Sequence, residues 1–212
     1  YNDEKIIFDG TRDISTFAVS GEVWEPINKT IVNDNNISEN VTLYRINVES
    51  SCNPIQLFLN REEIINARYP SAQWNDESVY NLENWCHGYY NKPSLGDPYY
   101  YENGEIIDFS HTNINLLEFY NKKKLIDTSF NLKDAIVNLN VGSFKSYTKI
   151  VNDMQILSNP DRIKLYYDEV ALWKTKHHYY YLENKLEFLN SQNEWYYDKE
   201  NNYIYVRLKD DL

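Results

Sequence analysis

The sequence predicts a mainly β fold, a compact barrel or sandwich with one or two short helices. Short runs of aromatic and β-branched residues alternate with turns rich in Asn, Asp and Gly, at intervals of about ten residues. Such spacing is typical of a meander, a sandwich or the short rungs of a β-helix. A chain of 212 residues can bury a sizeable core. We therefore expect one mainly-β domain over residues 1–212.

The clearest local signal is a β-hairpin near the end of the sequence. Two aromatic and β-branched runs, 194–198 and 203–208, flank the turn residues Lys199-Glu200-Asn201-Asn202. Just upstream, Leu182, Leu186 and Leu189 recur at spacings of four and three, which predicts a short amphipathic helix at about 182–190.

The remaining strands are predicted by the same alternation. Asn60-Arg61-Glu62 is a tight turn between two of them, and Pro70 ends the second. The predicted strands are 6–8, 14–19, 30–32, 41–48, 56–59, 63–68, 106–109, 115–120, 135–141, 147–153, 154–157 and 162–167.

Charge and hydropathy limit the function. The chain has 21 basic and 32 acidic residues, a net charge of −11, and such a surface repels phosphate backbones, so we expect no nucleic-acid partner. No apolar run approaches the length of a membrane span. Because the sequence opens with Tyr1 and its only methionine is Met154, we expect an earlier segment to have been removed, by processing or by the choice of segment, and any signal peptide with it. Separately, we expect a secreted, cell-surface or virion location.

Two kinds of covalent modification would fit that location. Three N-glycosylation sequons begin at Asn28, Asn36 and Asn40. Cys52 and Cys86 either form a disulfide in an oxidising compartment or stay as two thiols.

The long turn-rich stretch 71–98 is the candidate binding region. Sugar recognition uses flat aromatic faces beside polar side chains, and this stretch combines tryptophans and tyrosines with Asn, Asp and Glu. The alternative is that the tryptophans fill the core. The candidate ligand-binding residues, including one just after this stretch and two from the aromatic run further on, are Trp74, Trp85, Tyr89, Tyr90, Tyr100, His177 and Tyr179.

Signals for catalysis are weaker. Pairs of acids such as Glu194 with Asp198, or Asp168 with Glu169, suit glycoside cleavage if 5–9 Å apart, but the first pair occupies hairpin positions. His177 and His178 point to opposite faces of an extended segment and cannot bind one metal together. We expect no catalytic residue, metal or cofactor.

Three blocks, LFLNREEIINARYP (57–70), DAIVNLNVGSFKSYTKIV (134–151) and HHYYYLENKLEFLNSQNEWYYDKENNYIYV (177–206), carry a family resemblance. Over about 57–208 the chain resembles a β-rich segment inserted in right-handed parallel β-helix (pectin-lyase-like) proteins, many of them polysaccharide-active. Asn193 stands where that pattern has Gly, and Asn201-Asn202 replaces its Thr-Gly. Active relatives carry their catalytic carboxylates on a solenoid that this sequence lacks.

The resemblance therefore implies a carbohydrate context without catalysis by this segment. The leading hypothesis is a secreted or surface module that binds glycan, a protein partner or a parent β-helix. Two alternatives stay open: a polysaccharide hydrolase or lyase, and a structural protein of a cell coat or viral particle.

Overall fold

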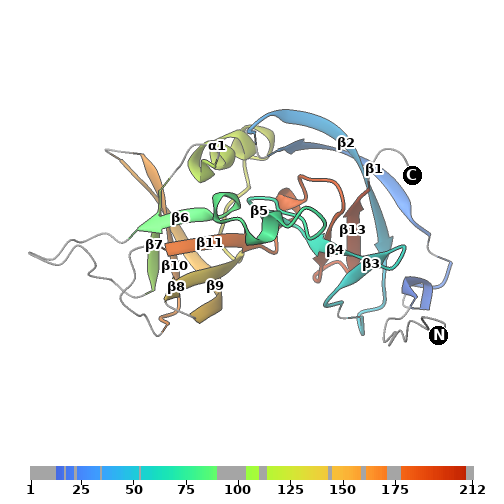
Figure 1. The fold of residues 1–212 in the computed structure, drawn as a ribbon. Helices are drawn as coiled ribbons and strands as arrows, with labels where there is room; N and C mark the ends of the chain where they lie inside the picture. The colour runs from blue at the N-terminus through green and yellow to red at the C-terminus, as the bar shows by residue number, and fades with distance from the viewer. Residues whose placement is uncertain are drawn as a thin grey trace, which may run out of the picture.

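The computed structural model is mainly β, as predicted, and combines a mixed sheet, a closed barrel and one α-helix within the described residues (Figure 1). The strand predicted at 6–8 lies outside those residues. The structure describes residues 13–16, 18–21, 23–33, 35–52, 54–89, 104–109, 114–142, 145–158, 161–170 and 178–208.

The mixed sheet joins the two ends of the described chain in the strand order β1-β2-β13-β12-β4-β3. Neighbouring strands are antiparallel except β12 and β4, which are parallel. The predicted turn at Asn60-Arg61 is confirmed: both residues have positive φ, which matches the twist of a two-residue hairpin loop. The strands are β1 (Glu25–Val32), β2 (Ser38–Asn47), β3 (Leu57–Leu59), β4 (Glu62–Asn66), β12 (Glu194–Asp198) and β13 (Tyr203–Arg207).

The predicted hairpin at 194–208 is also confirmed. Asp198 fixes its turn, because its side chain accepts hydrogen bonds from the backbone N–H groups of Glu200 and Asn201, both at 3.1 Å. Trp195 and Tyr205 are both buried. The hairpin thus contributes large aromatic side chains to the core.

The barrel consists of six antiparallel strands closed by the pairing of β8 with β11. Along β11, Tyr180 and Leu182 are fully buried while Tyr179 and Tyr181 are half-buried, so alternate residues face the interior. Closure leaves no unpaired edge on these strands. The short strand β5 (Arg68–Tyr69) pairs with the end of β11. The barrel strands are β6 (Cys86–Tyr89), β7 (Glu105–Asp108), β8 (Ile136–Gly142), β9 (Lys145–Leu157), β10 (Arg162–Tyr167) and β11 (His178–Glu183).

The barrel is inserted between two adjacent parallel strands of the mixed sheet. The chain leaves the sheet after β4 and returns at β12, where Glu194 is in register with Ile65 and Trp195 with Asn66. The N–H of Ala67 then donates to the carbonyl of Trp195 at 2.7 Å. The exit and the return of the barrel are therefore hydrogen-bonded side by side.

A stack of aromatic rings joins the two parts. Tyr69 of β5 stacks on Phe119 of the helix α1 (Leu116–Ile126), with ring centroids 4.2 Å apart, and Phe188 lies 6.1 Å from Phe119. All three side chains are fully buried. Because these rings come from three separate segments, they hold barrel, helix and sheet around one main core.

The strand predicted at 115–120 is wrong, since this segment begins helix α1. Asn115 caps the helix by accepting a hydrogen bond from the N–H of Glu118 at 3.0 Å, and Lys123 and Lys124 lie in the last turn. Both signals were present in the sequence. No helix in the described ranges is long and apolar enough to cross a bilayer.

The helix predicted at 182–190 is also wrong. Its first two residues end strand β11, and only Leu186–Phe188 form a 3-10 turn. This segment forms a strand and not a helix because Tyr180 and Leu182, two residues apart, both point into the barrel. Asn184, with φ of 66°, then ends the strand. Similarly, the strand expected at 14–19 begins as the 3-10 turn Ile14–Thr16.

Replacing Phe119 tests the aromatic stack. We expect Phe119→Ala to lower the free energy of unfolding by about 3–5 kcal/mol, because it leaves a cavity between Tyr69 and Phe188. Urea titration followed by circular dichroism measures this change. The control is Leu125→Ala on the same helix, whose side chain is 82% exposed and should cost under about 0.5 kcal/mol. Equal effects would contradict the role of the stack.

Lys123 gives the fold a predictable pH dependence. It is buried, its amine lies 5.4 Å from the Phe119 ring centroid, and burial lowers the pKa of Lys123 from 10.5 to about 8. The unfolded state therefore binds more protons between about pH 8 and 10.5, so this lysine destabilises the fold below pH 8 and stops doing so as pH rises.

We expect Lys123→Met to stabilise the fold at pH 7 by up to about 3 kcal/mol, and the gain to shrink toward pH 10.5. Denaturant titrations of both proteins across this pH range provide the measurement. Lys122→Met is the control at an exposed position of the same helix and should show no such trend. A gain that does not depend on pH would rule out the titration of Lys123 as its cause.

Candidate functional site

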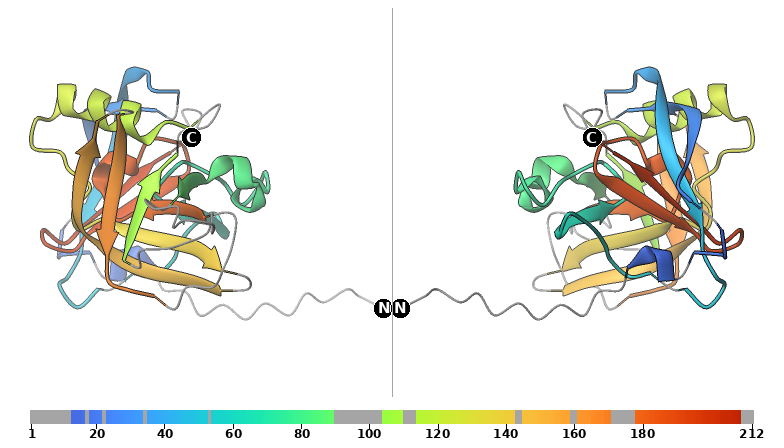
Figure 2. Two further views of the ribbon diagram at one scale, coloured as in Figure 1. Left: turned by 90° about the vertical axis from the view of Figure 1, so that its left-hand side faces the viewer. Right: turned by 90° about the vertical axis from the view of Figure 1, so that its right-hand side faces the viewer.

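The segment between β5 and β6 is a compact loop that stands out from the body of the molecule (green in Figure 2). It contains two 3-10 turns, Ser78–Tyr80 and Leu82–Asn84. Ser78 organises it: its hydroxyl accepts from the N–H of Gln73 at 2.7 Å, and its own N–H donates to Asp76 at 2.9 Å. We call residues 71–85 the recognition loop.

The underside of this loop is anchored to both parts of the fold. Ala72 and Val79 are buried against Ile65 of strand β4. The side-chain amide of Gln73 donates to the carbonyl of Gln192, which precedes β12. Apolar packing and hydrogen bonds therefore hold the loop in one conformation.

Arg68 anchors the end of the loop to the barrel. Its guanidinium centre lies 3.8 Å from the ring centroid of Tyr181 and 5.5 Å from that of Trp85. Its Nε donates to the carbonyl of Pro70 at 2.9 Å, and an Nη donates to that of Asn84 at 3.2 Å. A planar cation with several donors is suited to this combination of stacking and hydrogen bonding.

The outer surface of the loop carries two exposed aromatic rings. The Trp74 side chain is 45% exposed and that of Tyr80 is 73% exposed. Their ring centroids lie 6.2 Å apart at an interplanar angle of 61°. We call Trp74 and Tyr80 the aromatic platform. One ring can stack on a flat apolar ligand face while the other forms a wall beside it.

Only negative charges accompany the platform within the loop. Asp76, Glu77 and Glu83 are exposed, and residues 69–89 contain no lysine or arginine. Hydrogen bonds from the hydroxyl and the N–H of Ser78 lower the pKa of Asp76, so this side chain is ionised at neutral pH.

Of the predicted ligand-binding residues, Trp74 fits that role best. The Trp85 ring packs on Arg68 and Tyr181, and its indole N–H donates to the carbonyl of Val79 at 3.1 Å, so Trp85 supports the loop. Tyr179 is half-buried in edge contact with His87, their rings 4.7 Å apart.

Three further candidates, Tyr90, Tyr100 and His177, lie outside the described residues, and Tyr89 pairs with Ile107 in the barrel. Tyr80 was missed from the sequence. The available signal was its position six residues after Trp74 within the same polar turn region.

The acid pair predicted in the hairpin, Glu194 and Asp198, accepts hydrogen bonds from backbone N–H groups. Glu194 is fully buried and accepts hydrogen bonds from the N–H groups of Asn190 and Ser191, while Asp198 holds the turn described above. Asp168 accepts from the side chain of Asn152 at 2.9 Å. Within the described ranges, no three His, Cys, Asp or Glu side chains gather as a metal site would require.

The predicted disulfide between Cys52 and Cys86 is not formed. Both thiols are buried, but Cys52 belongs to a small cluster on the mixed sheet and Cys86 to the main core. The alternative of two thiols holds because the two cysteines pack in separate clusters.

Two of the three sequons face each other across strands β1 and β2. The Thr30 hydroxyl donates to the Asn40 side chain at 2.7 Å, and the Thr42 hydroxyl donates to that of Asn28 at 3.3 Å. Asn28 and Asn40 are exposed, whereas Asn36 is half-buried with φ of 59°. Glycosylation at these positions stays a prediction.

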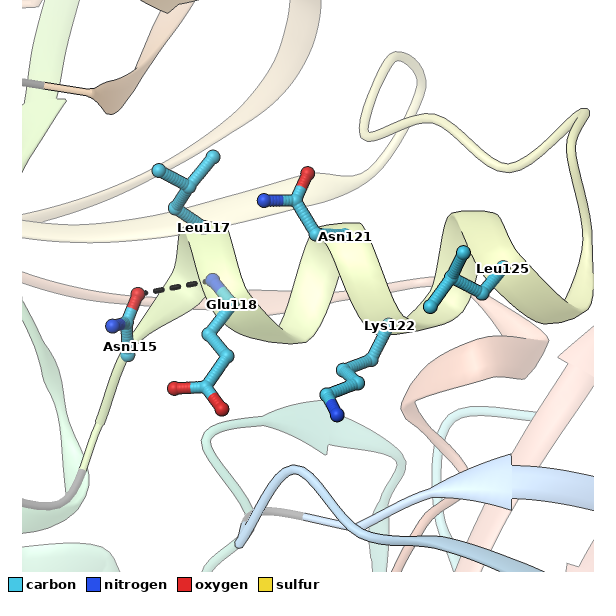
Figure 3. A pocket seen from close by; sticks show the side chains of 6 residues that line it. All are labelled: Asn115, Leu117, Glu118, Asn121, Lys122 and Leu125. Atoms are coloured by element: carbon cyan, nitrogen blue, oxygen red, sulfur yellow. Dashed lines mark hydrogen bonds between the residues drawn. The ribbon is translucent and has the colours of Figure 1, made fainter.

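A pocket of about 300 Å³ lies along helix α1 (Figure 3). All of its lining residues come from this helix and its cap, and the pocket is a shallow hollow between their side chains. It offers fewer convergent groups than a binding cavity requires. The lining residues are Asn115, Leu117, Glu118, Asn121, Lys122 and Leu125.

Comparison with known proteins identifies the fold. No family model and no curated protein matches the chain. One solved structure, described as a glycoside hydrolase, is similar to it with a TM-score of 0.51, at 13% sequence identity over 91% of this chain. The chain spans 29% of the length of that protein. The barrel and the mixed sheet together therefore share the fold of one part of a larger protein.

Replacing Arg68 tests the anchoring of the recognition loop. We expect Arg68→Lys to lower the free energy of unfolding by about 1–3 kcal/mol, because lysine keeps the charge but loses the stacking and one of the two hydrogen bonds. Amide hydrogen exchange should rise at Asn84 and Trp85. Arg61→Lys, in the exposed β3–β4 turn, is the matched control. Unchanged exchange in the loop would show that Arg68 does not anchor it.

Proposed function

We propose that the chain is a non-catalytic module that binds glycans through the aromatic platform. The observation that carries the proposal is the exposure of Trp74 and Tyr80 on a loop that packing and hydrogen bonds hold in one conformation. An ordered aromatic surface binds a sugar ring without the entropy cost of immobilising flexible side chains.

The insertion of the barrel supports the same proposal. Strands β4 and β12 are parallel neighbours, as rungs of a β-helix would be, and the barrel lies between them in the sequence. This arrangement suits the resemblance to an inserted segment of β-helix proteins, and the similar structure is described as a glycoside hydrolase. We propose a secreted or cell-surface location, where a module of this kind would meet polysaccharides.

The hydrolase or lyase alternative has less support. Glu194 and Asp198 hold backbone turns, and Glu194 has no contact with solvent. A glycosidase needs two carboxyl groups that reach the substrate from a groove. For the coat-protein alternative, no feature described above favours it over glycan binding.

Binding to polysaccharides tests the proposal. We expect the purified chain to be retarded in affinity gels that contain a recognised polysaccharide, and Trp74→Ala and Tyr80→Ala each to weaken binding about tenfold, equivalent to about 1.4 kcal/mol. Phe58→Ala removes an aromatic ring of similar exposure, 40%, on strand β3 and should leave binding unchanged.

Because all three side chains are at least 40% exposed, the variants should keep the circular dichroism spectrum of the parent protein. Equal losses in all three variants would show that the platform is not the site. Failure of the parent chain to bind any member of a broad glycan array would contradict the proposed function.

A further inference from the structure

We infer that the aromatic platform prefers glycans that contain amino sugars with free ammonium groups and rejects polymers of uronic acids. This inference rests on the proposed function and specifies its ligand class. It is argued from the charges that share the recognition loop with Trp74 and Tyr80.

The first step is the sign of the charge around the aromatic platform. Asp76, Glu77 and Glu83 are exposed on the recognition loop, and Glu77 lies between the two aromatic residues in sequence. The neighbouring cation, Arg68, is only 3% exposed, because it lies under Trp85 and Tyr181. A ligand that reaches the platform therefore meets carboxylates from this loop and not the guanidinium. A carboxylate on the ligand would be repelled.

The second step is the chemistry of the rings. The face of an indole or phenol ring attracts a cation within about 6 Å of its centroid. Trp74 and Tyr80 present exposed rings at an angle of 61°, so an ammonium group on a sugar bound to one ring can approach the other ring or a nearby carboxylate. A neutral sugar obtains the stacking contact alone.

The third step is the charge of the whole protein. A net charge of −11 lowers the local concentration of polyanions and raises that of polycations near the surface. The effect is screened by salt, with a Debye length of about 8 Å at physiological ionic strength. A preference that depends on these charges must therefore weaken as salt is added.

The experiment compares oligosaccharides of equal length and different charge; chitosan and chitin differ only in the acetyl group on nitrogen. Isothermal titration of the whole chain uses chitosan hexasaccharide, N-acetylated chitin hexasaccharide and hexagalacturonate as cationic, neutral and anionic probes of equal length. The pH is set below the pKa of the glucosamine amine, so that chitosan carries ammonium groups, and above the ordinary pKa of glutamate, so that Glu77 and Glu83 are ionised. We expect chitosan to bind about fivefold more tightly than chitin, from two or three exposed charge interactions, and the galacturonate not to bind. In 0.5 M salt the difference between chitosan and chitin should disappear.

Glutamate-to-glutamine variants distinguish the effect of the loop carboxylates from that of the aromatic platform. Glu77→Gln combined with Glu83→Gln should bring chitosan to the affinity of chitin and leave chitin binding unchanged. Glu62→Gln combined with Glu200→Gln, at exposed positions in β4 and in the β12–β13 turn, removes the same net charge outside the loop and should keep most of the preference.

Each other result has a defined meaning. If all three probes bind equally and Trp74→Ala abolishes that binding, the proposed function stands and the inference on ligand class is wrong. Tightest binding to hexagalacturonate would overturn the inference in the same way. If no probe binds, the inference fails, and the glycan array then decides separately whether the proposed function fails with it.

Discussion

The parallel pairing of β4 with β12 is the constraint on which the rest of the structure depends. Parallel neighbours need a long connection, and here that connection is the whole barrel. The buried carboxylate of Glu194 accepts from two backbone N–H groups at the return point. The side chain of Asn190 donates to the carbonyl of Val32 in β1, so the return is tied to another strand of the sheet. Hydrogen bonds inside a core fix geometry strongly.

The same junction explains why the recognition loop is ordered. The loop begins two residues after Tyr69, whose ring is in the central stack, and ends just before Cys86, a buried residue of the barrel. Between these fixed ends, Ser71 donates to the side chain of Asn190, and Gln73 donates to the carbonyl of Gln192. The loop is thus held by the segment through which the chain re-enters the sheet.

An element of secondary structure could be predicted from the sequence where the local pattern fitted only one kind of element. The hairpin of β12 and β13 was predicted because its alternating aromatic residues and its Asn-rich turn agree. At 115–120 a helix cap and a short apolar run competed, and the strand was the wrong choice. At 182–190 the leucine spacing indicated a helix, but only the barrel could show that Leu182 belongs to a two-residue period. Trp74 was identified as a binding candidate, whereas Tyr80 was not.

The sequence by itself determined the mainly-β class, the turns at Asn60-Arg61 and Lys199-Asn202, and the negative charge, because each follows from neighbouring residues or from composition. The tertiary structure alone decided that β8 meets β11 and that β4 meets β12 in parallel, since these pairings join segments far apart in the chain. It also decided which of the two tryptophans of the recognition loop presents its ring to solvent. Trp74 and Trp85 stand in similar polar surroundings in the sequence, but only Trp85 meets Arg68 and Tyr181. Burial depends on such contacts between distant segments, which local sequence patterns do not contain.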